Sequence, residues 1–114
     1  MQIILTSREE PLSKAWAKYC GDLDFVRLYD GSILDLDCDA VVSPANSFGY
    51  MDGGIDMLYS QHFGWHVQER LQRTIRERHG GELVVGQAEL IETDNSRISY
   101  VVAAPTMRVP MILG

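Results

Sequence analysis

The feature that most constrains this chain is a short apolar run that leads through a turn-rich segment directly into a helical pattern. Residues 39–43 have the apolar centre of a strand that is buried on both faces. Residues 44–54 are rich in turn-forming residues, and a helical apolar pattern follows them. In α/β folds small ligands bind beyond the carboxyl ends of the strands. We therefore expect residues 44–54 to form a ligand-binding loop.

The rest of the chain alternates between strand and helix patterns. Further strands are expected at residues 3–5, 24–29, 83–93 and 98–106. Helices are expected from Pro11 to Cys20, at residues 55–63 and at residues 65–79, and a break near Gly64 separates the last two. The tight turn at residues 94–96 favours antiparallel pairing of the last two strands. The sequence predicts an α/β fold, with three α/β/α layers and a mixed sheet, in a single domain over residues 1–114.

Composition and charge argue against several classes of function. The net charge of −6 disfavours broad nucleic-acid binding. No stretch has the length of a signal peptide or of a membrane span, so we expect a cytoplasmic protein without a membrane partner. Cys20 and Cys38 have no paired metal spacing, and Gly64 separates His62 from His66, so neither a metal nor a cofactor is expected.

The glycine pair Gly53-Gly54 precedes the helix that follows the loop. Glycine lets the backbone approach a ligand closely, and the free N–H groups and dipole of a helix start favour negative charge. This pattern alone is a weak signal, because many helices begin after glycine for steric reasons. It indicates an anion site without identifying the ligand.

The segment also resembles a known family. Residues 31–56 read GSILDLDCDAVVSPANSFGYMDGGID, which is similar without a gap to the macrodomain pattern of Gly-Asp-Ile-Thr, a spacer, Asp-Ala-Ile-Val-Asn-Ala-Ala-Asn and then Gly-Gly-Gly-Val. Further on, Gly86-Gln87-Ala88 and residues 100–105 look like the Gly-x-Ala strand of the family and its following buried strand.

The resemblance implies a cleft for ADP-ribose or a related nucleotide. In that cleft Asn46 would bind the distal ribose, and the backbone of Gly53, Gly54 and Ile55 would contact the diphosphate. Asp56 matches the acid of hydrolytic members, which would orient or activate a water molecule. From the residues alone two plainer interpretations stay open: Asn46 as a turn former, and Asp56 as a residue that complements the helix N-terminus.

Three positions depart from the family pattern. Ser32, with Ile33 beside it, stands where the family has the aspartate that contacts adenine, so base selectivity is in question. Ser43 stands where catalytic members often have the first asparagine of the pair, so the resemblance implies that it contacts the ligand, but the change to serine weakens the enzyme hypothesis. Asp52 stands where the glycine run would begin, so we expect the loop to take its own shape.

Two functional hypotheses follow. The first is a binder of ADP-ribose or of ADP-ribosylated protein, with ADP-ribosyl hydrolase or ADP-ribose-1''-phosphate phosphatase activity left open. The alternative is a macrodomain-like scaffold or assembly protein that does not bind nucleotide. Macrodomains continue beyond the point that matches residues 107–114, so we expect an incomplete domain. We further expect its apolar segment 107–113 to pack against a partner chain in a homo-oligomer.

Overall fold

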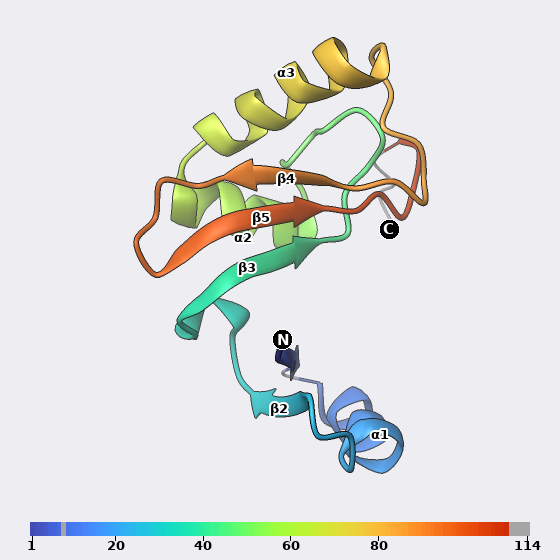
Figure 1. The fold of residues 1–114 in the computed structure, drawn as a ribbon, viewed down its shortest axis with the longest axis vertical. Coiled ribbons are helices and arrows are strands. Elements are labelled where there is room, and N and C mark those ends of the chain that lie inside the picture. The colour runs from blue at the N-terminus through green and yellow to red at the C-terminus, as the bar shows by residue number, and fades with distance from the viewer. Residues whose placement is uncertain (8, 110–114) are drawn as a thin grey trace. The chain divides into compact units, whose positions relative to one another are not determined.

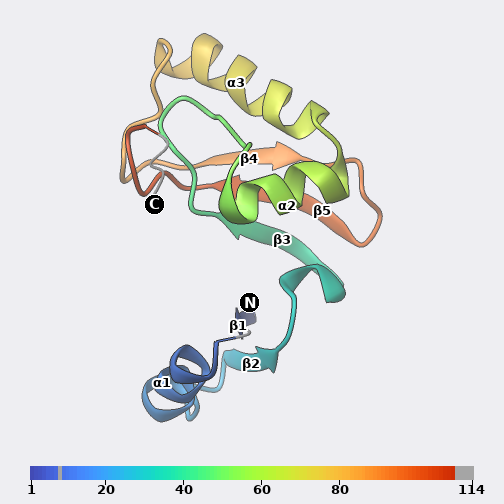
Figure 2. The same cartoon turned by 180° about the vertical axis from the view of Figure 1, so that it is seen from behind.

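The computed structural model describes residues 1–7 and 9–109, and its strands fall into two sheets. The chain divides into two units, Met1–Asp37 and Cys38–Gly114, and each unit contains one of the sheets (Figure 1, Figure 2). Among the described residues, no helix has the length and apolar character that crossing a bilayer requires. The expected single domain over residues 1–114 stays a prediction.

The first unit is a β-α-β arrangement. Strand β1 (Ile3–Ser7) and strand β2 (Val26–Asp30) pair in parallel, and helix α1 (Glu10–Cys20) connects them. Pro11 lies in the first turn of α1, where a missing backbone N–H costs nothing. A short 3-10 helix, η1 (Ile33–Asp35), follows β2. The strands and the helix expected in this part of the sequence are confirmed, with ends that differ by a few residues.

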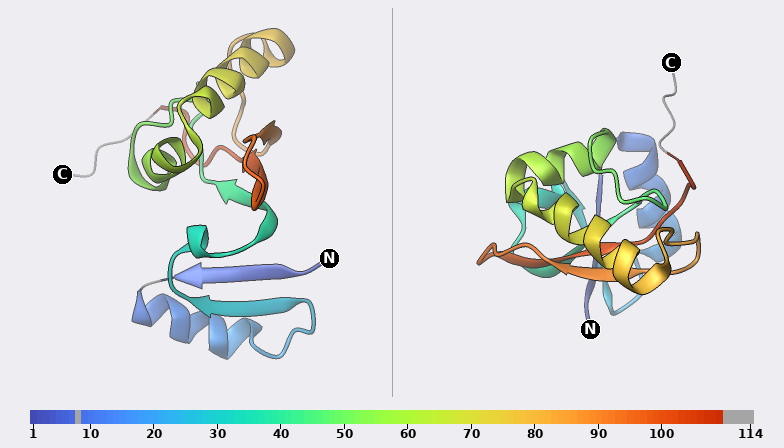
Figure 3. Two further views of the ribbon diagram at one scale, coloured as in Figure 1. Left: turned by 90° about the vertical axis from the view of Figure 1, so that its left-hand side faces the viewer. Right: turned by 90° about the horizontal axis from the view of Figure 1, so that it is seen from above.

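The second unit is a three-stranded mixed sheet with two helices on one face (Figure 3). Strands β3 (Cys38–Ser43) and β5 (Ile98–Ala103) are parallel, and β4 (Glu89–Glu92) pairs with β5 in the antiparallel direction. The helices are α2 (Gly54–Phe63) and α3 (His66–His79). The α/β class, the mixed strand direction and the antiparallel pairing predicted from the sequence are therefore confirmed.

The core of this unit lies between the sheet and the helices. Val67, Leu71 and Ile75 recur every four residues along α3 and are fully buried. They share this core with Val41 of β3 and Val101 of β5, which pair with each other in the sheet and are also buried. The candidate site lies between the end of β3 at Ser43 and the start of α2 at Gly54.

The expected strand over residues 83–93 is too long. Leu83 is buried and its N–H donates to Ser47 O (2.8 Å), but regular pairing begins only at Glu89. Gly86 has a φ of 102°, and the N–H of Gln87 donates to Val84 O across the turn (3.0 Å). This turn interrupts the extended run, because an ordinary strand does not contain a residue in the left-handed region.

Candidate functional site

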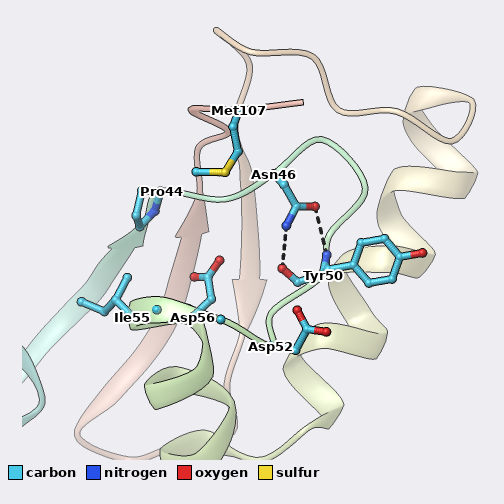
Figure 4. Close-up of a pocket in the computed structure, with 9 residues that line it drawn as sticks. Pro44, Asn46, Tyr50, Asp52, Ile55, Asp56 and Met107 are labelled. Carbon is cyan, nitrogen blue, oxygen red and sulfur yellow. Dashed lines mark hydrogen bonds between the residues drawn. The ribbon is translucent and has the colours of Figure 1, made fainter. Parts of the chain in front are cut away.

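A pocket of about 220 Å³ lies beyond the carboxyl end of β3, at the start of α2 (Figure 4). This is the position expected for a ligand site in an α/β sheet. The described residues that line it belong to the second unit: Pro44, Asn46, Tyr50, Asp52, Gly53, Gly54, Ile55, Asp56 and Met107.

Asn46 holds the loop that forms one wall of the pocket. Its side-chain oxygen accepts from the N–H groups of Phe48 (3.1 Å) and Tyr50 (3.2 Å), and its amide nitrogen donates to Tyr50 O (2.7 Å). The side chain is buried, yet it lines the pocket. These bonds agree with the turn-forming interpretation of Asn46, and among the described residues the second N–H of its amide has no hydrogen-bond partner.

The end of the loop is anchored on both helices. Met51 is fully buried, its N–H donates to Gln68 Oε1 (2.7 Å), and its carbonyl accepts from Ser60 Oγ (2.7 Å). Because these contacts use both backbone polar groups of Met51, the chain enters the glycine pair from a fixed point.

Gly53 and Gly54 form the start of α2 without side chains beside the pocket. Gly54 has a φ of 57°, in the left-handed region that favours glycine, and a Cβ added at either position would meet no atom within 4 Å. The N–H of Met57 makes the first helical bond, to Gly53 O (3.2 Å). The N–H groups of Gly54, Ile55 and Asp56 precede that bond and have no partner within the helix.

Asp56 and Ser43 form a buried polar pair between α2 and the end of β3. Ser43 Oγ donates to Asp56 Oδ1; Ser43 is fully buried and Asp56 is 6% exposed. Burial raises the pKa of the Asp56 carboxyl above its ordinary value of 3.8, and the hydrogen bond from Ser43 opposes that rise. Ser43 itself does not line the pocket, so it acts on the pocket only through Asp56.

Tyr59 ties the same helix to β3. Its hydroxyl donates to Val42 O (3.0 Å), and its ring is fully buried. Burial, together with the nearby charge of Asp56, raises the pKa of Tyr59, so its hydroxyl stays protonated. The carboxyl of Asp56 is therefore held on a helix whose position is fixed.

Met107 closes the pocket from a distant part of the sequence. It forms an isolated β-bridge with Asn46, and Ser47 N–H donates to the carbonyls of Met107 and Arg108 (both 3.1 Å). Arg108 pairs with Glu82 (3.1 Å) and lies over the ring of Phe48. Residues 107 and 108 belong to the segment 107–113 that we expected to pack against a partner chain, and they contact their own chain. Residues 110–113 of that segment lie outside the described residues. Oligomerisation stays a prediction.

The site residues predicted from the sequence belong to both units of the chain. The structure brings five of them together at the pocket: Asn46, Gly53, Gly54, Ile55 and Asp56. Ser32 and Ile33 lie in the first unit, where Ser32 Oγ accepts from the N–H of Leu34 (3.3 Å) and caps η1.

Sequence reasoning did not assign four of the lining residues: Pro44, Tyr50, Asp52 and Met107. Tyr50 and Asp52 fall inside the expected loop, and Asp52 had been noted only as a departure from the glycine run. Met107 carries no sequence signal, because it reaches the pocket only through backbone pairing with Asn46.

The two histidines four residues apart do not face a shared site. The ring of His62 packs edge-on against Phe63, whereas His66 Nε2 lies 2.8 Å from Thr93 O. Within residues 1–7 and 9–109, no group of three or more His, Cys, Asp or Glu side chains is arranged to hold a metal ion.

Comparisons with known proteins identify the family. The family model of the macro domain matches residues 42–111. An uncharacterized protein of Aquifex aeolicus is 33% identical over 85 residues, which cover 75% of this chain and 48% of that protein. A macro domain-containing protein of Caldanaerobacter subterraneus is 34% identical over 79 residues, which cover 69% of this chain and 44% of that protein.

The solved macrodomain of DarG from Mycobacterium tuberculosis has the same fold. The match has a TM-score of 0.58 and 21% identity, and it covers 73% of this chain and 55% of that one. The chain spans about half the length of the curated relatives that it matches. The family match includes the end of β3, the loop and the start of α2, which together build the pocket. The chain belongs to the macrodomain family.

Proposed function

We propose that this chain binds ADP-ribose or a closely related nucleotide at the pocket, with the diphosphate against the start of α2. Macrodomains generally bind ADP-ribose, and the chain belongs to that family. The observation that carries the proposal is the set of backbone N–H groups of Gly54, Ile55 and Asp56, which precede the first helical bond at residues that line the pocket. Such a helix start favours a bound anion through its N–H groups and its dipole.

The size of the pocket suits part of such a ligand. Pockets for drug-sized ligands usually have volumes of about 300–1,000 Å³, and this one has about 220 Å³. We therefore expect it to hold the distal ribose with the adjoining diphosphate, while the nucleoside lies outside it. The second N–H of the Asn46 amide is a suitable donor to a ribose hydroxyl.

Hydrolysis is a second candidate function, favoured by the Ser43–Asp56 pair. Asp56 lines the pocket, and the hydrogen bond from Ser43 to its Oδ1 restricts how the carboxyl can rotate. A carboxylate in a fixed orientation can accept a proton from a water molecule that attacks the anomeric carbon of the distal ribose, while the bond from that carbon to the attached group breaks and the group leaves with the bonding electron pair. Loss of product formation in Asp56→Asn, with ADP-ribose binding retained, would support this role.

The binding proposal is tested by isothermal titration calorimetry with ADP-ribose, AMP and ribose phosphate. The informative variant is Gly53→Ala, because Gly53 has an extended backbone (φ −146°) that alanine adopts and an added methyl group meets no protein atom within 4 Å. We expect the fold to be unchanged and ADP-ribose affinity to fall at least about tenfold, since the methyl group stands where the diphosphate would approach the backbone.

The matched control is Gln61→Ala, an exposed position on the same helix away from the pocket. It should bind as the unchanged protein does. Absence of heat with all three ligands would favour the scaffold hypothesis. Equal affinity of Gly53→Ala and the unchanged protein would place the nucleotide elsewhere.

A further inference from the structure

The charged side chains that line the pocket are both carboxylates. Asp52 and Asp56 contribute them, and no Lys, Arg or His is among the described lining residues. Figure 4 shows both carboxylates beside the space between the loop and the start of α2. The start of α2 contributes a positive electrostatic potential at the pocket, because the helix dipole there is equivalent to roughly half an elementary positive charge.

Neighbouring groups do not cancel the two negative charges. Burial raises the pKa of Asp56, and the hydrogen bond that it accepts from Ser43 opposes this rise, so that bond supports the charged form of the carboxyl without cancelling its charge. Asp52 is exposed, and within the described residues it has no ion pair. Arg108, which follows the lining residue Met107, is paired with Glu82. The pocket therefore has a net negative charge beside a single anion-binding element.

A diphosphate can use that element, but a further phosphate cannot. The N–H groups of Gly54, Ile55 and Asp56 are donors for one diphosphate at the helix start. Once these donors are engaged, an added phosphate on the distal ribose would face Asp52 and Asp56 without a cationic partner among the described lining residues. Like charges brought together at a binding surface weaken binding markedly.

On the basis of the proposed function, we infer that Asp52 and Asp56 make the pocket select against a phosphate group on the distal ribose. The pocket then takes ADP-ribose, or an ADP-ribosyl group joined to a neutral or cationic side chain, in preference to ADP-ribose 1''-phosphate. The substrate class that fits this charge pattern is an ADP-ribosylated side chain, and the phosphate ester is disfavoured.

The test compares calorimetric titrations of ADP-ribose and ADP-ribose 1''-phosphate at low salt. For the unchanged protein we expect affinity for the phosphorylated ligand to be at least about tenfold lower. Asp52→Asn should reduce that ratio at least about threefold, since it removes one of the two charges and keeps the shape of the side chain. Raising the salt concentration should also reduce the ratio, because Asp52 is exposed to solvent.

The matched control is Glu77→Gln, which changes the net charge by the same amount at an exposed position on α3 that does not line the pocket. It should leave the ratio unchanged. Equal or tighter binding of the phosphorylated ligand by the unchanged protein overturns the inference and leaves the proposed function intact. An equal effect of Asp52→Asn and Glu77→Gln on the ratio also overturns it. If ADP-ribose itself does not bind, the proposed function fails, and the inference fails with it.

Discussion

Replacing Ser43 by alanine should destabilise the protein through Asp56. Ser43 Oγ donates to Asp56 Oδ1, and both residues are buried. The substitution leaves a buried carboxylate oxygen without this donor. Hydrogen bonds to charged groups contribute about 1.5–3 kcal/mol, and we expect Ser43→Ala to lower the free energy of unfolding by about that amount at pH 7.

The loss should depend on pH in a defined direction. Burial raises the pKa of Asp56 in the folded protein above 3.8. At a pH above this folded-state pKa, the buried charged carboxyl lowers the stability of the folded protein. Protonation of the carboxyl at lower pH removes this loss of stability. Loss of the Ser43 hydrogen bond raises the folded-state pKa further. The difference between Ser43→Ala and the unchanged protein should therefore be largest near neutral pH and should shrink as the pH falls towards 3.8.

Urea denaturation of four proteins over the range from about pH 4 to pH 8 measures this effect. The four are the unchanged protein, Ser43→Ala, Asp56→Asn and the double variant, so that a double-mutant cycle isolates the coupling. A side-chain ¹³C titration of Asp56 should show a higher pKa in Ser43→Ala. The reasoning is refuted if the stability difference is independent of pH and equally large in the Asp56→Asn background.

Two further substitutions test the loop that forms the wall of the pocket. Asn46→Ala removes the hydrogen bonds to Phe48 and Tyr50, so it should lower the free energy of unfolding by about 1–3 kcal/mol, as measured by urea denaturation. Its affinity for ADP-ribose, measured by calorimetry, should also fall. Unchanged stability would contradict the role of Asn46 in holding the loop. Ser47→Ala should leave the free energy of unfolding unchanged or raise it in the same assay, because Ser47 Oγ is buried without a hydrogen-bond partner among the described residues. A decrease in the free energy of unfolding of more than about 1 kcal/mol would show that the hydroxyl has such a partner.

Local patterns in the sequence predicted most elements of the second unit. The four-residue recurrence of Val67, Leu71 and Ile75 defines the buried face of α3. The turn at residues 94–96 is made by Asn95, whose side-chain oxygen accepts from the N–H groups of Arg97 and Ile98 (2.9 and 3.0 Å). Such signals are contained within a few residues, so they can be recognised without tertiary structure.

Features that depend on distant pairing were not predictable in the same way. The start of β4 was placed too early, because an apolar run does not reveal that Gly86 takes a left-handed conformation. The ligand contact expected of Ser43 stays a prediction, and the sequence did not reveal that its hydroxyl bonds Asp56, thirteen residues later in the chain. The packing of residues 107–113 against a partner chain stays a prediction, and the sequence did not reveal that the backbone of Met107 pairs with Asn46. Each outcome is decided by which groups meet in space.

The most direct test of the account is the response of the backbone amide signals to ADP-ribose in ¹H–¹⁵N NMR spectra. If the diphosphate binds at the start of α2, the largest changes on titration should be those of Gly53, Gly54, Ile55 and Asp56, whose backbone lines the pocket. Amides in the middle of α3 should change little, because those residues do not line the pocket. Unchanged spectra at millimolar ADP-ribose, or changes confined to residues away from the pocket, would contradict the central claim.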